Sequence, residues 1–142
     1  MVVLKASPTK RLSKLRSIGT GSEIIPPGLV RSVLEYFEGK CVVTAIYGMT
    51  ETTCIATAHQ VYRVSDMCSS KVPVGKPIPN SKVYILDEKM QSVPEGTVGE
   101  IYIAGHNVMP SYTDLGLSKG TLRENKLEKD PTYILKTGDF GV

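Results

Sequence analysis

The segment Tyr47–Glu51 brings an aromatic ring, a glycine, a hydroxyl and a carboxylate together within a few residues. The ring of Tyr47 could stack on a base, the hydroxyl of Thr50 could bond a phosphate oxygen, and the carboxylate of Glu51 suits a hard cation that keeps most of its waters. Gly48 would allow a tight turn or a close approach of the backbone to a ligand. A nucleotide with bound Mg²⁺ requires such groups, although a strand followed by the Thr-Glu start of a helix would explain the same pattern.

The elements before this segment are predicted to be a strand, a helix and a second strand. A β-branched and apolar run from Cys41 to Tyr47 indicates a buried strand. A helix is expected to begin at Pro26-Pro27, because the first turn tolerates proline, and to end near Gly39. The run from Leu15 to Ile18 indicates a short first strand.

Such a βαβ unit implies parallel strands with the helix lying across them. In sheets of this kind a ligand lies beyond the carboxyl ends of the strands. Gly19–Glu23 and Tyr47–Glu51 each follow a predicted strand. The two segments are therefore expected to converge on one site.

The pattern changes near residue 70, after which short apolar runs alternate with segments rich in proline and glycine. Such runs predict antiparallel strands joined by turns, as in a small barrel. They lie at residues 82–87, 98–105 and 133–139, the last entering a glycine turn that ends in a carboxylate, and residues 119–129 are charged and weakly helical or irregular. The predicted fold is α/β followed by a small β-barrel, with a boundary between residues 1–70 and 71–142.

Composition excludes several classes of protein. With 41% hydrophobic and 22% charged residues, the 142-residue chain is typical of a globular protein rather than a disordered one. A net charge of +3 is too small to indicate nucleic-acid binding, and no apolar run is long enough for a membrane span or a signal peptide. Cys41, Cys54 and Cys68 have neither zinc nor disulfide spacing, which indicates free thiols in a reducing compartment such as the cytoplasm. His59 and His106 have no acidic or cysteine partner at ligand spacing.

Several motifs occur in an order that resembles one known superfamily. They are Ile18–Glu23, Tyr47–Thr53, Val74–Asn80 with Val83–Asp87, Gly99–Gly105 and Lys136–Asp139. From about Leu15 onward the chain resembles part of the large N-terminal domain of adenylate-forming, or AMP-binding, enzymes, which include acyl-CoA synthetases and the adenylation domains of nonribosomal peptide synthetases. The stretch around Val74–Asp87 favours the peptide synthetases. Met49, where those domains usually have proline, favours acyl-CoA or aryl-CoA ligases.

The resemblance implies a two-step activity. A carboxylic or amino acid attacks the α-phosphate of ATP to give an acyl-adenylate and pyrophosphate, and a thiol, of coenzyme A or a carrier pantetheine, then takes the acyl group. Tyr47 would stack on adenine, and the turn Gly21-Ser22-Glu23 would lie along the base. Thr50 would bond the α-phosphate, Glu51 would hold Mg²⁺, and Asp139 would accept hydrogen bonds from both ribose hydroxyls.

The same resemblance implies part of an acyl pocket. Its expected lining is mostly apolar and uncharged, and consists of Ile18, Thr20, Ile46, Cys54 and Ile55. This lining predicts a substrate with a small or moderately apolar side chain. Ile46 and Ile55 could equally belong to the core of the sheet.

Two parts of the family pattern are missing from this sequence. It contains no phosphate loop rich in glycine, serine and threonine, and no lysine-bearing C-terminal domain follows the Thr-Gly-Asp motif before Val142. We therefore expect the chain to be a fragment that is inactive alone and that needs the rest of a longer parent enzyme. The alternative is a truncated, non-catalytic module that binds a nucleotide or a protein partner.

Overall fold

The computed structural model describes residues 14–21, 23–67, 71–127 and 133–142. These residues form two compact units. The first unit consists of the described residues up to Tyr47 together with Ala58–Lys76, and the second unit consists of Gly48–Thr57 together with the described residues of Pro77–Val142. The predicted division at residue 70 remains a prediction.

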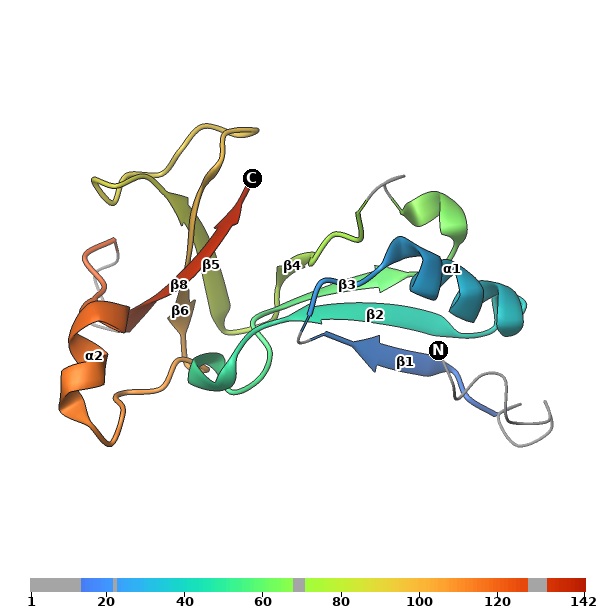
Figure 1. The fold of residues 1–142 in the computed structure, drawn as a ribbon, viewed down its shortest axis with the longest axis horizontal. Helices are drawn as coiled ribbons and strands as arrows, with labels where there is room; N and C mark the ends of the chain where they lie inside the picture. Colours follow the sequence, from blue (N-terminus) through green and yellow to red (C-terminus); the bar gives the residue numbers. More distant parts are fainter. Residues whose placement is uncertain (1–13, 22, 68–70, 128–132) are drawn as a thin grey trace. The chain divides into compact units, whose positions relative to one another are not determined.

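The elements are β1 (Ser17–Thr20), α1 (Pro27–Tyr36), β2 (Val42–Tyr47), a 3-10 helix (Thr50–Thr52), β3 (Thr57–Val61), a second 3-10 helix (Val64–Asp66), β4 (Lys76–Pro77), β5 (Ser81–Leu86), β6 (Gly99–Gly105), α2 (Leu115–Thr121), β7 (Leu122–Glu124) and β8 (Tyr133–Gly141) (Figure 1).

Helix α1 has one apolar face, and this face forms the core of the first unit. Val30, Val33 and Leu34 are buried on it and cluster with Val43 and Ala45 of β2. A proline in the first turn begins the helix, as the sequence predicts. Past its C-terminal end, the backbone N–H of Gly39, which has φ of +71°, donates to the Leu34 carbonyl at 3.0 Å. The predicted helix is thus confirmed.

The first sheet has the strand order β1-β2-β3-β4. Strands β1 and β2 pair in parallel, with Ser17 opposite Val42 and Thr20 opposite Ala45. This pairing confirms the predicted βαβ unit. Strand β3 was not predicted, because the adjacent polar residues His59 and Gln60 in its sequence Thr-Ala-His-Gln-Val interrupt the alternation of apolar and polar residues.

The second sheet is antiparallel, with the order β5-β6-β8-β7. Its antiparallel strands are as predicted. In the part of the chain that the structure describes, however, the order is linear, with β5 and β7 at the two edges, so the sheet is open rather than closed into the predicted barrel. Strand β7 spans only Leu122–Glu124 and gives little backbone for closing the sheet by further pairing.

The charged segment before β8 is more regular than the sequence indicates. Helix α2 precedes β7, and the Asp114 side chain caps the helix by accepting a hydrogen bond from the Gly116 backbone N–H at 2.8 Å. None of the helices in the described ranges is long and apolar enough to cross a membrane.

Candidate functional site

The carboxyl ends of β1 and β2 bring Gly21 and Tyr47 to the same edge of the first sheet. Because Thr20 pairs with Ala45, the following residue Gly21 lies against Ile46. A Cβ atom at Gly21 would lie 2.5 Å from the Ile46 carbonyl oxygen, so the glycine is needed for close packing of the two chain segments. Tyr47 is half-buried at the end of β2.

The rest of the predicted adenine turn is only partly visible. Glu23 is exposed in the first unit. Ser22 lies outside the described residues. The contact of this turn with a base therefore remains a prediction.

Gly48 begins a tight reversal of the chain. A Cβ atom there would lie 2.5 Å from the Cys54 carbonyl oxygen, 2.8 Å from the Ile55 Cα and 2.9 Å from the Ala56 nitrogen. Gly48 therefore allows a close approach between two segments of the chain's own backbone.

Side-chain hydrogen bonds hold this reversal in place, although two of its residues have unusual backbone angles. The buried Thr52 hydroxyl accepts a hydrogen bond from the Met49 N–H and donates one to the Met49 carbonyl, both at 3.0 Å. Thr53 and Cys54 follow with φ angles of +53° and +75°, a region that is costly for a β-branched residue such as threonine. Surrounding contacts must therefore fix the shape of the segment.

Glu51 lies in the 3-10 helix of this reversal, and its carboxylate is held by a tyrosine that is distant in the sequence. The Tyr112 hydroxyl donates a hydrogen bond to Glu51 Oε1. Oε2 has no hydrogen-bond partner among the residues that the structure describes. The hydrogen bond to Glu51 raises the pKa of Tyr112 above its usual value, and burial and the negative charge of Glu51 act in the same direction, while a hydrogen bond with Thr121 opposes them.

This donor set fits a magnesium ion that is bound mainly by substrate. No group of three or more His, Cys, Asp or Glu side chains in the described ranges could hold a metal alone. Mg²⁺ commonly takes one or two protein carboxylates and completes its shell with phosphate oxygens and water. Glu51 would supply such a single carboxylate. Thr50, the predicted phosphate ligand, is exposed next to it.

The predicted glycine turn before Asp139 is wrong, because the Thr-Gly-Asp motif lies inside β8 as an irregularity in the strand. The pairing of β8 with β6 shifts between Glu100 and Tyr102. Gly138 has φ of +81° there. Thr137 bridges the gap, since its hydroxyl donates to the Ile101 carbonyl at 2.8 Å and accepts from the Asp139 N–H at 3.1 Å.

This bulge leaves Asp139 exposed on the second sheet. Lys136, which precedes the Thr-Gly-Asp motif, forms an ion pair with Glu100 at 3.4 Å. Glu100 also accepts a hydrogen bond from the Tyr102 hydroxyl at 3.3 Å. The contacts of Lys136 are therefore those of a residue that supports the strand pair.

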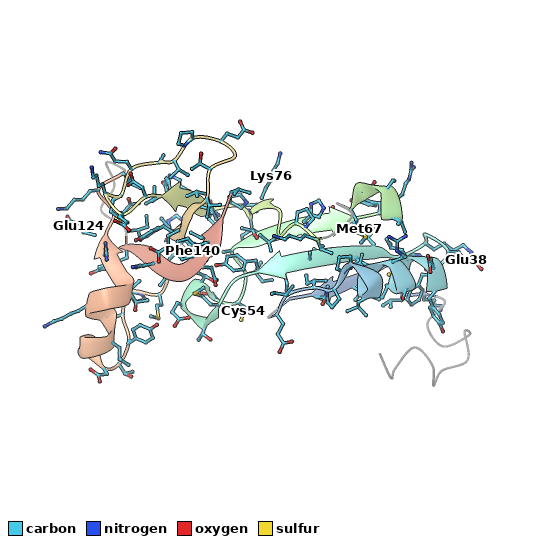
Figure 2. The ribbon with its side chains drawn as sticks, turned by 45° about the horizontal axis from the view of Figure 1, so that its top comes forward. Glu38, Cys54, Met67, Lys76, Glu124 and Phe140 are labelled. Atoms are coloured by element: carbon cyan, nitrogen blue, oxygen red, sulfur yellow. The ribbon has the colours of Figure 1, made fainter. Side chains whose placement is uncertain are left out.

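The predicted pocket residues divide between the two units. Ile18, Thr20 and Ile46 are half-buried in the first unit, where Ile18 packs against the core that α1 covers. Ile55 is half-buried in the second unit. Cys54 is exposed in the same unit, on the reversal that follows β2 (Figure 2). None of the five carries a charge.

The predicted nucleotide residues divide in the same way. Gly21, Glu23 and Tyr47 belong to the first unit, and Thr50, Glu51 and Asp139 belong to the second. Sequence reasoning missed Tyr112. It also missed Asn107, whose amide N–H₂ donates to the carbonyls of residues 52 and 55 at 3.3 and 3.1 Å. The sequence gives only a weak indication of a role for Asn107 and Tyr112, namely that both are polar and follow the predicted strand 98–105.

Comparison with known proteins places these features in a family. The family model described as AMP-binding enzyme matches residues 1–113. The nonribosomal peptide synthetase asaC of Aspergillus flavus is 39% identical over 127 residues, which cover 85% of this chain and 12% of that protein. The chain thus spans only a small part of this relative.

Two solved structures have a similar fold. PA1221, described as a nonribosomal peptide synthetase protein containing adenylation and PCP domains, superposes with a TM-score of 0.84 at 27% identity, covering 97% of this chain and 28% of that one. The Klebsiella oxytoca NpsA N-terminal subdomain, solved in complex with 3-hydroxybenzoyl-AMSN, superposes with a TM-score of 0.83 at 22% identity, covering 98% and 35%. The chain therefore belongs to the AMP-binding enzyme family and is close to the adenylation domains of nonribosomal peptide synthetases.

Proposed function

We propose that this chain is part of a ligase that activates a carboxylic or amino acid with ATP and passes the acyl group to a thiol. The acid oxygen attacks the α-phosphorus, pyrophosphate leaves, and the thiol of a carrier pantetheine or of coenzyme A then displaces AMP from the acyl carbon. Family membership and the similarity to asaC support this proposal. Because the chain spans 12% of asaC and 28% of PA1221, we propose that it works within a longer parent protein.

The observation that carries the proposal is the geometry of Glu51. Glu51 comes shortly after the end of β2 in the sequence. Its Oε1 accepts a hydrogen bond from Tyr112, and its Oε2 has no hydrogen-bond partner in the described part of the chain. A single oriented carboxylate is what Mg²⁺ needs from a protein when phosphates supply its other ligands. The bound ion would neutralise negative charge on the phosphates.

The other site residues would bind and orient the nucleotide. Tyr47 stacks on adenine beside the turn Gly21-Ser22-Glu23, Thr50 bonds the α-phosphate, and Asp139 accepts from the ribose hydroxyls. Adenylyl transfer depends on positioning and charge neutralisation more than on a protein nucleophile. The site needs no activated serine or cysteine.

The acid substrate is proposed to have a small or moderately apolar side chain. The five pocket residues carry no charge, and a charged substrate group would lose its hydration there without gaining an ionic partner. Cys54 and Thr20 would be the only polar contributors among the five.

An ATP–pyrophosphate exchange assay with a panel of acids tests the proposed function in the parent protein. We expect exchange with one or a few acids of small or moderately apolar side chain, and none from the 142-residue chain alone. A clear preference for a charged side chain would contradict the proposed pocket. Absence of exchange with every acid would favour the non-catalytic alternative.

A further inference from the structure

The loop that follows β6 forms a cradle for the chain reversal that carries Glu51. We call residues 107–112 the cradle loop. Its Met109 N–H donates to the Glu51 carbonyl at 2.8 Å. Asn107 takes part twice, because its side chain donates to two carbonyls of the reversal and its own carbonyl accepts from the Thr53 hydroxyl at 2.9 Å. Both sides of these contacts lie in the second unit, more than fifty residues apart in sequence.

Tyr112 extends this cradle from the backbone of the reversal to the carboxylate. Its hydroxyl donates to Glu51 Oε1, while its backbone N–H donates to the Ser118 hydroxyl of α2 at 3.0 Å. The tyrosine is half-buried. It is therefore fixed at the backbone by α2 and at the hydroxyl by Glu51, and it restricts the directions in which the Glu51 carboxylate can turn.

We propose that Tyr112 is a positioning residue that holds Glu51 Oε1 and thereby leaves Oε2 to bind the magnesium ion of the nucleotide. The inference rests on the proposed function, since it assigns Tyr112 to the same site. A ligand carboxylate that is free to rotate loses conformational freedom when the ion binds, and a hydrogen bond to its other oxygen removes most of that cost in advance. Outer partners of this kind commonly change metal affinity by about 10- to 100-fold.

The first test uses Tyr112→Phe in the parent protein, with the Mg²⁺ dependence of pyrophosphate exchange as the readout. The variant keeps the ring and removes only the hydroxyl. We expect the half-saturating Mg²⁺ concentration to rise about tenfold, with kcat restored at saturating Mg²⁺. Tyr62→Phe is the matched control, because the Tyr62 hydroxyl also donates to a side chain, Gln60 Oε1 at 2.6 Å, in the other unit. It should leave the Mg²⁺ dependence unchanged.

A lower kcat at saturating Mg²⁺ with an unchanged half-saturating concentration would contradict the inference and indicate a purely structural role. So would a Mg²⁺ dependence equal to that of the wild type.

The second test does not require adenylation activity. The ionisation of Tyr112 is obtained from the ultraviolet absorbance of tyrosinate, as the difference between wild type and Tyr112→Phe. We expect a pKa above the ordinary value of about 10, because the neutral hydroxyl donates to Glu51, and a return toward that value in Glu51→Gln. A parent that shows no exchange but retains this coupling would refute the proposed function while keeping the Tyr112–Glu51 contact. A Tyr112 pKa that does not respond to Glu51→Gln would overturn the inference.

Discussion

Glu51→Gln in the parent protein is expected to lower the rate of adenylate formation by about 10²- to 10³-fold. The substitution preserves the shape of the side chain, and the amide oxygen can still accept the Tyr112 hydrogen bond. It removes the negative charge that a hard cation requires. Losing one preorganised electrostatic contact in an active site commonly costs this much in rate. The measurement is the initial rate of ATP–pyrophosphate exchange at fixed Mg²⁺ with the preferred acid.

The control is Glu88→Gln, which removes a carboxylate from the exposed turn after β5. It makes the same change in net charge without touching the reversal at residues 48–55. We expect its exchange rate to match that of the wild type. A Glu51→Gln variant with wild-type activity and wild-type Mg²⁺ dependence would show that Glu51 does not bind the ion.

Gly48→Ala is expected to destabilise the chain reversal by about 3 kcal/mol, at the upper end of the cost of overpacking. The added Cβ would lie within 2.9 Å of three backbone atoms, the nearest being the Cys54 carbonyl oxygen at 2.5 Å. Backbone atoms cannot rotate away as a side chain can, so the reversal must open. Hydrogen exchange of residues 48–57 in the parent protein measures this as faster exchange of the amides in that segment.

Gly120→Ala is the matched control in the same unit. Gly120 lies in α2, and a Cβ atom there would have no heavy atom of the described residues within 4 Å apart from its chain neighbours and the nearby backbone of its own helix. We expect residues 48–57 to exchange at the wild-type rate in this variant. Equal exchange in Gly48→Ala would mean that the close approach of Gly48 to residues 54–56 does not exist in solution.

The first half of the fold could be predicted well because its signals are local. The spacing of the apolar residues in α1, with prolines at its start and a glycine after its end, marks the helix. The β-branched run of β2 marks a buried strand, and the crossover through α1 between β1 and β2 favours parallel pairing of the two strands. Strand β3 could not be predicted from the sequence, because the adjacent polar residues His59 and Gln60 break the alternation of apolar and polar residues that marks a strand.

The second half and the supporting contacts of the site depend on interactions between distant residues. The Thr-Gly-Asp motif contains a glycine and a carboxylate, which predicts a turn, but Thr137 bonds to Ile101 and keeps the motif inside β8. The contact between Tyr112 and Glu51 joins residues 61 apart in sequence. Neither periodicity nor spacing reports such pairs. The resemblance to a known family therefore identifies the motif residues, whereas only the fold shows which residues hold Glu51.

Titration of the parent protein with a fluorescent ATP analogue tests the central claim most directly, namely that Tyr47 and Asp139 bind one adenosine. Stacking of an aromatic ring on a base contributes about 1–3 kcal/mol, so we expect Tyr47→Ala to weaken binding about 5- to 150-fold and Tyr47→Phe to retain it. Asp139→Asn should weaken binding as well, since it removes the charged acceptor of the ribose hydroxyls. Wild-type affinity in both Tyr47→Ala and Asp139→Asn would contradict the account.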